Sequence, residues 1–384
     1  MSKVFLGDVA VERRETCKGS KDGYPIVGLE HLTPEEITLT AWNEDSENTF
    51  TKMFRKGDIL FGRRRAYLKK AAVAPFDGIC SGDITVIQAK PDLILPELLP
   101  FIIQNDALFD FAVGKSAGSL SPRVKWEHLK NYEFELPEMD KQRELAGLLW
   151  AMDATRKSYQ RLITVTDELV KSQFIEMFGK RDGAIYCTLE ECCVSVTGGS
   201  TPSMKHEEYY GGEVPFIKSG DVKADYISSG ALWLTQRALD ETTAKYVPAG
   251  TVVVVTRSGI LKHDLPVAIT SNPVVINQDL KAFEPKPEFS PQYIAWAIRS
   301  REDELLSKTR VMTVDNIESK DLYEIPVMIA SREDQEQFAA FVRLSDKSKF
   351  ANLICSNLNL WSSSAILNMC QMAGKGSHLE MFAT

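Results

Sequence analysis

The sequence lacks the apolar segments that place a protein in or across a membrane. No run approaches the roughly 18–20 residues that a membrane-spanning helix requires. The best apolar stretch, Thr251–Val255, is typical of a buried strand. Residues Met1–Asp8 show neither the apolar core nor the cleavage site of a secretory signal. We therefore expect a cytoplasmic location.

Potential metal ligands are few. The chain has 7 cysteines and 5 histidines. Cys187, Cys192 and Cys193 cluster without the C-x-x-C spacing of zinc sites, and no histidine lies near them. Reduced thiols of a cytosolic protein are the better interpretation, so we expect no metal site.

Motifs of enzymes that act on DNA are missing as well. An amino-methyltransferase needs an Asn/Asp-Pro-Pro-aromatic motif and a glycine-rich cofactor loop. The nearest approach, Asn272–Val275, lacks the second proline and the aromatic ring. Thr197–Thr201 lacks the Gly-Lys-Ser/Thr of a phosphate-binding loop, and neither His-Glu-x-x-His nor Gly-x-Ser-x-Gly occurs. We therefore expect no catalytic residues.

The net charge of −8 gives the chain no general basic character. Nucleic-acid binding depends on the local field, however, and the charge is uneven. Between residues 52 and 70, Asp58 is the single acidic residue among eight basic ones. These are Lys52, Arg55, Lys56, Arg63, Arg64, Arg65, Lys69 and Lys70.

What the sequence does contain is an internal repeat with a period of about 190 residues. Each match is weak, but five in the same order are not chance. The matched segments are Tyr24–Glu30 with Val214–Val222, Lys56–Arg63 with Ala249–Arg257, Ser81–Ile87 with Asn277–Phe283, Tyr132–Pro137 with Leu322–Pro326, and Asp140–Glu144 with Asp334–Gln337.

Each half alternates short strands, Gly/Pro turns and helices, which is typical of a compact α/β (α+β) domain followed by a long helix. We expect strands at 58–61, 84–88 and 251–256, helices at Pro96–Ala112 and Pro291–Ser307, and a last strand that ends at Pro137 or Pro326. The predicted boundaries are a domain over 1–139, a helix over 140–179, a domain over 180–331, a helix over 332–372 and a disordered tail over 373–384.

Both predicted helices carry apolar residues at the three- and four-residue steps of a coiled coil. The first series is Leu145, Leu148, Met152, Thr155, Tyr159, Leu162, Thr166 and Leu169, and the second is Leu344, Ala351, Ile354, Leu358, Trp361 and Ala365. We expect the helices to pair antiparallel and to hold the two domains apart; about 38 helical residues span roughly 57 Å. The alternative is that each helix packs on its own domain.

Several segments resemble one known family. Val196–Ser203, Tyr209–Ile217 and Ser219–Val222 resemble the opening of a target recognition domain in the specificity (S) subunits of Type I restriction–modification systems. The strand at Gly57–Phe61, the pair Asn277–Gln278 and the Leu-Pro or Ile-Pro exit into a Gln-bearing helix fit the same pattern. No single motif is diagnostic, but their order, repeated twice, is specific.

This resemblance implies a DNA-binding subunit without catalysis of its own. Such a subunit reads a bipartite, asymmetric DNA site, with one half-site for each domain and unread base pairs between them. The implied partners are double-stranded DNA, two modification subunits that methylate adenine, and two ATP-dependent restriction subunits. S-adenosylmethionine, ATP and Mg would belong to those partners, with no cofactor in this chain.

The candidate DNA contacts are polar and basic loop residues at matching places of the two halves. The two donors of arginine fit O6 and N7 of guanine, and basic side chains also anchor phosphates. They are Arg63, Arg64, Arg65, Lys69, Lys70, Lys115, Ser119 and Arg123 in the first half, and Lys218, Arg257, Ser258, Lys262, His263, Asn277, Gln278, Arg310 and Thr313 in the second. Docking to an acidic partner is the alternative for the basic loops, and capping of a strand end for Asn277 and Gln278.

Two other functions stay open. One is a DNA methyltransferase or nuclease with an unrecognised site. The other is a protein-interaction scaffold of two modules without DNA affinity. A flat salt response of duplex binding, measured with the partner subunits present, would favour the scaffold.

We predict that the purified chain alone transfers no methyl group from S-adenosylmethionine to DNA, because it contains neither the base-flipping motif nor the cofactor loop of a methyltransferase. Incorporation of a labelled methyl group into duplex DNA measures this. Any turnover by the chain alone would contradict a non-catalytic subunit.

Overall fold

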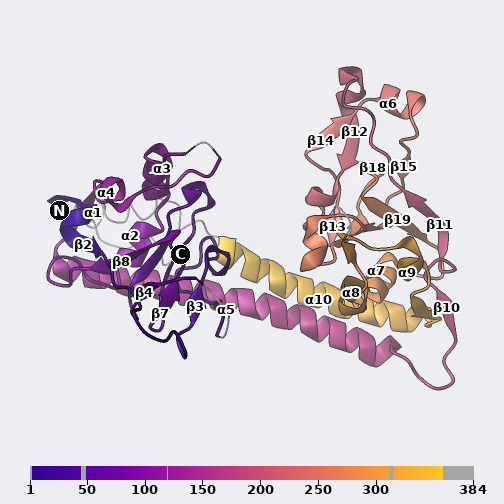
Figure 1. Cartoon of the computed structure of the whole chain (residues 1–384). Coiled ribbons are helices and arrows are strands. Elements are labelled where there is room, and N and C mark those ends of the chain that lie inside the picture. The colour runs from indigo at the N-terminus through magenta and orange to yellow at the C-terminus, as the bar shows by residue number, and fades with distance from the viewer. Residues whose placement is uncertain (1, 45–48, 119, 312–314, 358–384) are drawn as a thin grey trace. The chain divides into compact units, whose positions relative to one another are not determined.

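The computed structural model describes residues 2–44, 49–118, 120–311 and 315–357 (Figure 1). The chain divides into two compact units. The first consists of Met1–Gln160 with Leu353–Thr384, and the second of Arg161–Asn352. Within the described ranges, no helix combines the length and the apolar character that crossing a membrane requires.

The first unit is built on an antiparallel sheet with the order β2-β8-β5-β6. These strands are β2 (Ala10–Glu12), β8 (Ile84–Ala89), β5 (Ile59–Gly62) and β6 (Ala71–Val73). A smaller sheet has the order β3-β7-β4, formed by β3 (Ile26–Val27), β7 (Gly78–Cys80) and β4 (Lys52–Phe54). The terminal strand β1 (Ser2–Phe5) pairs with β9 (Glu133–Leu136). All residues of β5 are buried, which explains its continuous apolar sequence.

Short helices pack on the larger sheet of this unit. They are α1 (Leu6–Val9), α2 (Leu99–Ile103), α3 (Asp106–Gly114) and α4 (Trp126–Leu129). The ring of Phe109 on α3 stacks on that of Phe61 on β5, with centroids 5.5 Å apart. The core of the unit therefore lies between β5 and these helices.

The second unit has a sheet with the order β11-β19-β16-β17-β13 and another with the order β14-β12-β18-β15. The strands of the first are β11 (Cys193–Gly198), β19 (Leu280–Pro285), β16 (Val252–Val255), β17 (Val267–Thr270) and β13 (Tyr226–Ile227). Those of the second are β14 (Leu232–Leu234), β12 (Tyr210–Ile217), β18 (Val274–Ile276) and β15 (Tyr246–Val247). Two further pairs are β10 (Tyr186–Thr188) with β22 (Pro326–Met328), and β20 (Arg310–Val311) with β21 (Asp315–Asn316). The helices are α6 (Gln236–Glu241), α7 (Pro291–Arg299), α8 (Glu302–Ser307) and α9 (Ser319–Tyr323).

The two units repeat one pattern of strand pairing. Strands β2, β8, β5 and β6 are ordered as β11, β19, β16 and β17. Strands β3, β7 and β4 match β12, β18 and β15, with the same parallel and antiparallel senses. The pair β1·β9 matches β10·β22. The predicted mixed α/β fold with an internal repeat is therefore confirmed.

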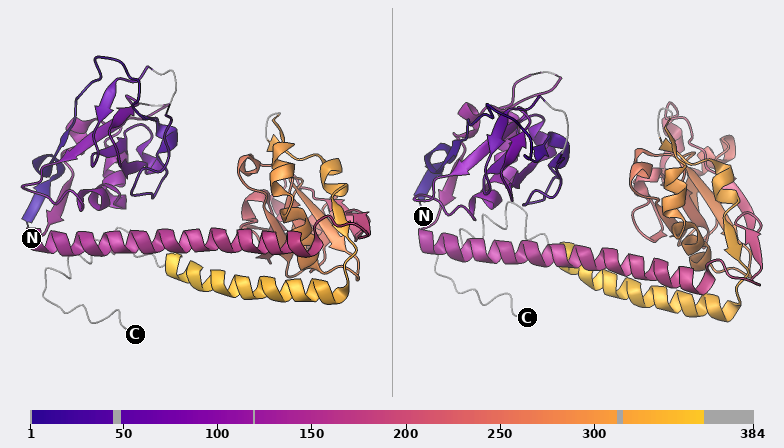
Figure 2. Two further views of the ribbon diagram at one scale, coloured as in Figure 1. Left: turned by 90° about the horizontal axis from the view of Figure 1, so that it is seen from below. Right: turned by 60° about the horizontal axis from the view of Figure 1, so that its bottom comes forward.

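A long helix follows the last strand of each unit: α5 (Met139–Phe178) and α10 (Arg332–Asn357). Within the second unit, the ring of Phe338 near the start of α10 lies 5.2 Å from that of Phe174 and 5.7 Å from that of Phe178. The end of α5 thus meets the beginning of α10, and the two helices run antiparallel side by side in this unit (Figure 2). The apolar residues that α5 buries are Leu145, Ala146 and Leu149 in the core of the first unit, and Val170, Phe174 and Phe178 in that of the second.

Burial along these helices does not follow the predicted apolar series. Leu162, Leu169 and Leu344 are 45%, 54% and 69% exposed. The buried positions near the end of α5 pack on the aromatic core of the second unit, so that core sets which face is buried. The predicted seam residues Ala351, Ile354, Leu358, Trp361 and Ala365, and the tail over 373–384, lie outside the described side chains.

Three predicted boundaries are wrong in detail. The helix expected over Pro96–Ala112 is divided into α2 and α3, because the side chain of Asn105 accepts a hydrogen bond from Ala107 N and begins a new helix. The helix expected over Pro291–Ser307 is likewise divided into α7 and α8. Pro326 begins β22 rather than ending a strand. A proline fits the first position of a strand, where its missing N–H is not needed.

A buried glutamine fixes the start of each long helix in the same way. Gln142 Oε1 accepts a hydrogen bond from Leu95 N (2.8 Å), and its Nε2 donates to Pro137 O (2.9 Å). In the second unit, Gln335 Oε1 accepts from Ser290 N (2.9 Å), and its Nε2 donates to Ala330 O (3.1 Å). Each glutamine therefore ties its helix to a preceding helical segment and to the end of the last strand.

We predict that Gln335→Ala lowers the stability of the second unit by about 1–3 kcal/mol, because it leaves the buried N–H of Ser290 without its acceptor. Calorimetric melting of the full chain measures this. Gln337→Ala is the matched control, since Gln337 is exposed on the same helix. Equal shifts for the two variants would contradict the role given to Gln335.

Candidate nucleic-acid interface

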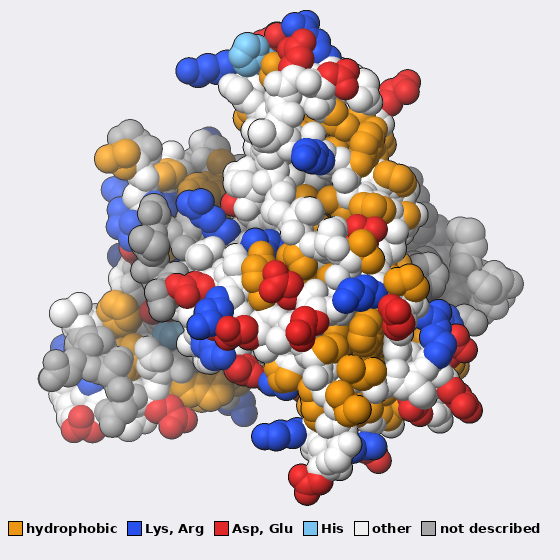
Figure 3. All heavy atoms as spheres, turned by 90° about the vertical axis from the view of Figure 1, so that its right-hand side faces the viewer, with side chains coloured by type: hydrophobic (Ala, Val, Ile, Leu, Met, Phe, Trp, Pro, Cys, Tyr) orange, Lys and Arg blue, Asp and Glu red, His pale blue; other side chains and the backbone are white. Residues whose placement is uncertain are grey.

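Charge is not gathered into one basic surface on the face of the molecule drawn in Figure 3. Lys and Arg side chains alternate there with Asp and Glu among hydrophobic ones. An electrostatic footprint must therefore be sought in local clusters of loops. The loops that carry the predicted contacts provide such clusters.

In the first unit, three segments meet at the end of β5. They are the loop 63–69, the turn 81–83 that precedes β8, and the loop 115–123 between α3 and α4. Arg63 N donates a hydrogen bond to Asp83 O (3.0 Å), which joins the first two segments. Backbone hydrogen bonds also join the third segment to the first, including Arg65 N to Pro122 O (2.8 Å). These hydrogen bonds join the described backbone of the three segments.

Two arginines face each other across this junction. Arg64 and Arg123 are partners in an antiparallel bridge. Arg123 Nε and Nη2 donate to the two carboxylate oxygens of Asp83, at 2.7 and 3.2 Å. Arg64 Nε donates to Ser121 Oγ (2.6 Å), and its Nη1 lies 3.5 Å from Asp83 Oδ2. One carboxylate thus lies between two guanidinium groups.

This cluster carries an excess of positive charge. The hydrogen bond from Arg123, together with the charges of Arg123, Arg64 and Arg63, holds the pKa of Asp83 below its usual value, although burial acts in the opposite direction. Three arginines surround this one acid. In addition, Arg63 Nε is buried and finds no hydrogen-bond acceptor in the described part of the chain. An anion bound at the exposed guanidinium groups would balance the excess charge.

The remaining basic residues of this loop differ in how far they are engaged. Arg65 is exposed and has a positive φ of 54°. Lys69 Nζ pairs with Asp106 Oδ1 at 2.5 Å, and Lys70 Nζ donates to Leu29 O at 2.8 Å. Of these three predicted contacts, Arg65 is therefore the side chain most available to a ligand.

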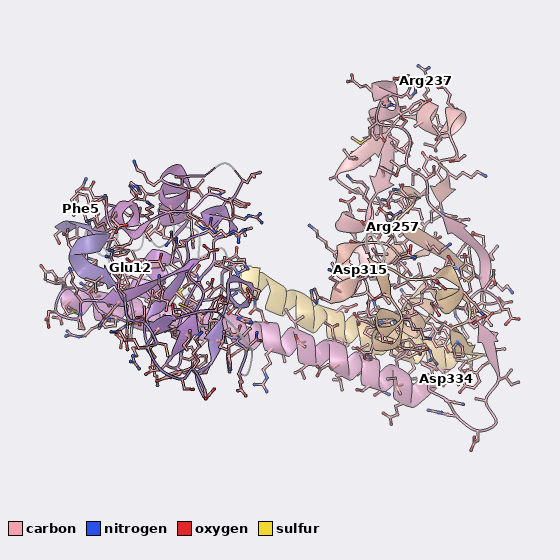
Figure 4. The ribbon with its side chains drawn as sticks, viewed as in Figure 1. Phe5, Glu12, Arg237, Arg257, Asp315 and Asp334 are labelled. Atoms are coloured by element: carbon pink, nitrogen blue, oxygen red, sulfur yellow. The ribbon has the colours of Figure 1, made fainter. Side chains whose placement is uncertain are left out.

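The second unit repeats the same backbone junction. Thr256 N donates to Asp279 O (2.9 Å), as Arg63 N does to Asp83 O. Arg257 and Asn316 form the bridge that matches Arg64 and Arg123. Ser258 N donates to the backbone oxygen of Asp315, and Figure 4 labels Asp315 and Arg257 on this part of the unit. Arg257 therefore corresponds to Arg64, one position later than the sequence match with Arg63 indicated.

The side chains on this second junction are different. Asn316 stands where the first unit has Arg123. Asp279 Oδ2 accepts a hydrogen bond from Asn277 Nδ2 (2.9 Å). Arg257 is exposed and has no polar partner among the described residues. Its guanidinium group is free to take a ligand.

Other predicted contacts of the second unit are Ser258, Lys262 and His263 on the same loop, and Lys218 after β12. Lys262 and His263 are exposed, and Lys262 Nζ is 4.0 Å from Asp315 Oδ2. Ser258 Oγ accepts from Ile260 N (3.4 Å) at the start of a 3₁₀ turn. Lys218 follows β12, and its backbone N–H donates to Asp221 Oδ2 (2.8 Å).

Asn277 and Gln278 are engaged within the protein. Asn277 is buried. Its side-chain Nδ2 donates to Asp279 Oδ2, and its Oδ1 accepts from Asp279 N (3.3 Å). Gln278 Oε1 accepts from Thr201 Oγ1. The hydrogen bond to Asp279 N, just before β19, corresponds to the capping alternative for Asn277, whereas Gln278 bonds to another side chain.

Some predicted contacts fall on residues that the structure leaves undescribed. Ser119 and Thr313 lie outside the described residues, and so does the side chain of Arg310, whose backbone forms β20. Lys115 is exposed, with its Nζ 5.8 Å from the centre of the Phe111 ring.

Sequence reasoning missed three residues of these junctions. Asp83 was passed over because it is acidic, and Ser121 and Asn316 because nothing in the sequence pairs them with Arg64 and Arg257. Asp83 and Asp279 occupy the same position of the repeat, where Gly-Asp in the first half matches Gln-Asp in the second. This match is the one signal in the sequence that could have pointed to the two acids.

The cysteine cluster of the second unit does not form a metal site in the described part of the chain. The Sγ atoms of Cys187 and Cys192 lie 2.8 Å apart. Burial raises the pKa of the Cys193 thiol to about 12 and also raises that of Cys192.

Comparison with known proteins identifies the family. The family model of the Type I restriction modification DNA specificity domain matches residues 1–165 and 186–352. The chain belongs to this family. Both matched regions contain one complete junction of the kind described above.

Relatives in the family include the specificity subunit of the Type I restriction enzyme EcoR124I/EcoR124II from Escherichia coli, 31% identical over 153 residues that cover 39% of this chain and 37% of that subunit. The MjaIX specificity subunit from Methanocaldococcus jannaschii is 30% identical over 156 residues, covering 39% and 35%. The HindI specificity subunit from Haemophilus influenzae is 20% identical over 327 residues, covering 65% and 70%. The chain thus spans little more than a third of the first two relatives.

Solved structures of the family share the fold. A chain from a type I R-M system has a TM-score of 0.54 and 21% identity, with 96% of each chain covered. The S subunit of a Type-I restriction-modification system from M. genitalium has a TM-score of 0.52 and 13% identity, with 95% of this chain and 94% of that one covered.

We predict that the ion pairs of Asp83 stabilise the first unit at neutral pH and not in acid. Since its folded-state pKa is lowered, this stabilisation is present above the unfolded-state value of about 4 and is lost as pH falls through the folded-state value. Asp83→Asn should therefore melt below the parent chain at pH 7, by at most about 1 kcal/mol for a partly exposed pair, and the gap should narrow in acid. A gap that widens as the pH is lowered would contradict this.

Proposed function

We propose that this chain is the DNA specificity subunit of a Type I restriction–modification system, and that each of its repeats reads one half-site of a bipartite, asymmetric DNA sequence. The observation that carries this proposal is the repeated junction. The backbone hydrogen bonds at the end of β5 and of β16 are the same, while the side chains on them differ. A constant frame with variable side chains suits two readers of different sequences.

The chemistry of the junctions fits duplex DNA. In the first unit, Arg64 and Arg123 share one carboxylate and leave guanidinium donors free. In the second, Arg257 is unpaired among the described residues. Arginine forks bind phosphate oxygens and the O6 and N7 atoms of guanine, so these residues suit both anchoring and reading. The other residues predicted as DNA contacts remain candidate phosphate or base contacts in this proposal.

The proposal includes the partners of the family. The chain would assemble with modification subunits that methylate adenine and with ATP-dependent restriction subunits, two of each, in the cytoplasm. S-adenosylmethionine, ATP and Mg would be bound by those subunits. The chain itself would contribute recognition of the duplex and a scaffold for the others, without a catalytic step.

We predict that duplex binding by the complex of this chain with its modification subunits weakens as salt rises, and that Arg257→Ala lowers the slope of log affinity against log salt by about 1. The affinity for the target duplex should fall roughly fivefold or more. Fluorescence anisotropy over a series of salt concentrations measures both quantities. Arg237→Ala is the control, because Arg237 is paired with Glu241 on α6 (Figure 4).

A salt response that is flat for the parent complex would instead favour a protein-interaction scaffold. Sequencing of methylated adenines in cells that carry the complex tests the reading itself. We expect a split motif; methylation without sequence preference would contradict recognition by two unlike readers.

A further inference from the structure

We propose that Asp83 is a positioning residue for DNA recognition: it holds the guanidinium group of Arg123, with that of Arg64 beside it, in the orientation that meets the duplex. This inference rests on the proposed function and adds a residue that takes no direct part in binding. Asp83 carries the wrong sign of charge for DNA, so its place in the cluster requires a reason other than attraction.

The cluster is unfavourable without an anion. Arg64 and Arg123 are direct partners in an antiparallel bridge, and like charges opposite each other on paired strands destabilise the pairing. Arg63 brings a third positive charge, and its buried Nε lacks an acceptor within the described ranges. Asp83 offsets one charge and leaves the rest. An incoming phosphate would reduce the repulsion between the guanidinium groups.

The pairing with Asp83 also decides which side of Arg123 is free. Arg123 uses Nε and one N–H of Nη2 to reach the two oxygens of Asp83. The other edge of the guanidinium group, formed by Nη1 and the second N–H of Nη2, keeps the two-donor fork that matches a phosphate or guanine. The side chain of Arg123 is 42% exposed and that of Asp83 21%. The carboxylate of Asp83 is therefore less exposed to solvent than the guanidinium group of Arg123 that it holds.

Asp83 itself is held by the backbone. Its N–H donates to Ser81 Oγ (3.2 Å), and its carbonyl oxygen accepts from Arg63 N (3.0 Å). Both hydrogen bonds fix the turn before β8, so the backbone from which the Asp83 carboxylate extends has a defined position. A two-point pair on a fixed residue removes rotamer freedom from Arg123 before DNA arrives, which lowers the entropy lost on binding.

The second unit provides a natural comparison. Asp279 occupies the same place and accepts the same backbone hydrogen bond, from Thr256 N. However, Asn316 replaces the partner arginine, and the carboxylate of Asp279 bonds to Asn277 instead. Among the described side chains, Asp279 therefore positions no arginine.

The test measures specificity rather than affinity alone. The complex of this chain with its modification subunits is titrated with a duplex that carries its methylated motif, and with a duplex of equal length in which both half-sites are scrambled. Asp83→Asn removes one negative charge and one acceptor with little change of shape. We expect the affinity for the motif to fall roughly 5- to 100-fold, although the variant is more positive, while the affinity for the scrambled duplex does not fall. Asp77→Asn is the matched control, because Asp77 pairs with Arg55 (2.9 Å) outside the three loops; it should keep the ratio of the two affinities within about twofold of the parent.

A second variant protects the test against a loss of folding. Arg123→Lys keeps the charge and the ion pair but has no two-donor fork. We expect it to lose specific affinity to a similar degree, with a melting temperature close to that of the parent chain. Binding of the motif by Asp83→Asn or by Arg123→Lys as tightly as by the parent would overturn the role of Asp83.

Failure of this inference and failure of the proposed function give different results. If the parent complex itself does not distinguish the motif from the scrambled duplex, the proposed function fails, and this inference with it. If the parent distinguishes them and either first-unit variant does so equally well, the proposed function stands and the role of Asp83 alone is refuted.

Discussion

The hydrogen bond from the residue after β5 to the backbone oxygen of Asp83, and its copy from Thr256 to Asp279, is the contact on which the rest of both candidate sites depends. It closes the turn before β8 or β19 against the preceding strand end. The third loop then pairs with the same segment through the bridge of Arg64 or Arg257. Because these contacts are made by the main chain, they tolerate exchange of almost every side chain. The two units of this chain share one backbone frame and differ in the side chains that it carries.

The sequence was sufficient for the repeat and for the fold class. Short apolar runs such as Val252–Val255 are fully buried strands, and five ordered matches were enough to align the halves. Helix boundaries were less accurate where a local side chain intervenes, as Asn105 does between α2 and α3. The predicted apolar series of the helices failed at Leu162 and Leu169, since periodicity cannot say which face meets the aromatic core around Phe338.

The sequence predicted which loops form the candidate site, but not which side chains of those loops pair with one another. Basic residues after a buried strand already indicated residues 63–65 and 257. Pairing of Arg64 with Arg123 depends on a contact between segments 59 residues apart in the chain, as does the position of Asp83 between them. The engagement of Lys70 with Leu29 O, which withdraws it from a ligand, is equally non-local. Composition and spacing carry no information on such contacts.

Gln142 and Gln335 attach the long helices with an uncharged side chain, whereas the recognition loops rely on guanidinium groups. Neutral amide hydrogen bonds in a buried place are nearly indifferent to ionic strength and to protonation, while exposed arginine contacts are screened by salt. Salt therefore weakens the contacts of the exposed arginines and leaves the glutamine hydrogen bonds that hold the long helices almost unchanged. If the chain binds DNA as proposed, a rise in salt would release the duplex and leave the anchorage of the helices intact, so that one duplex could be exchanged for another without loss of the protein's own structure.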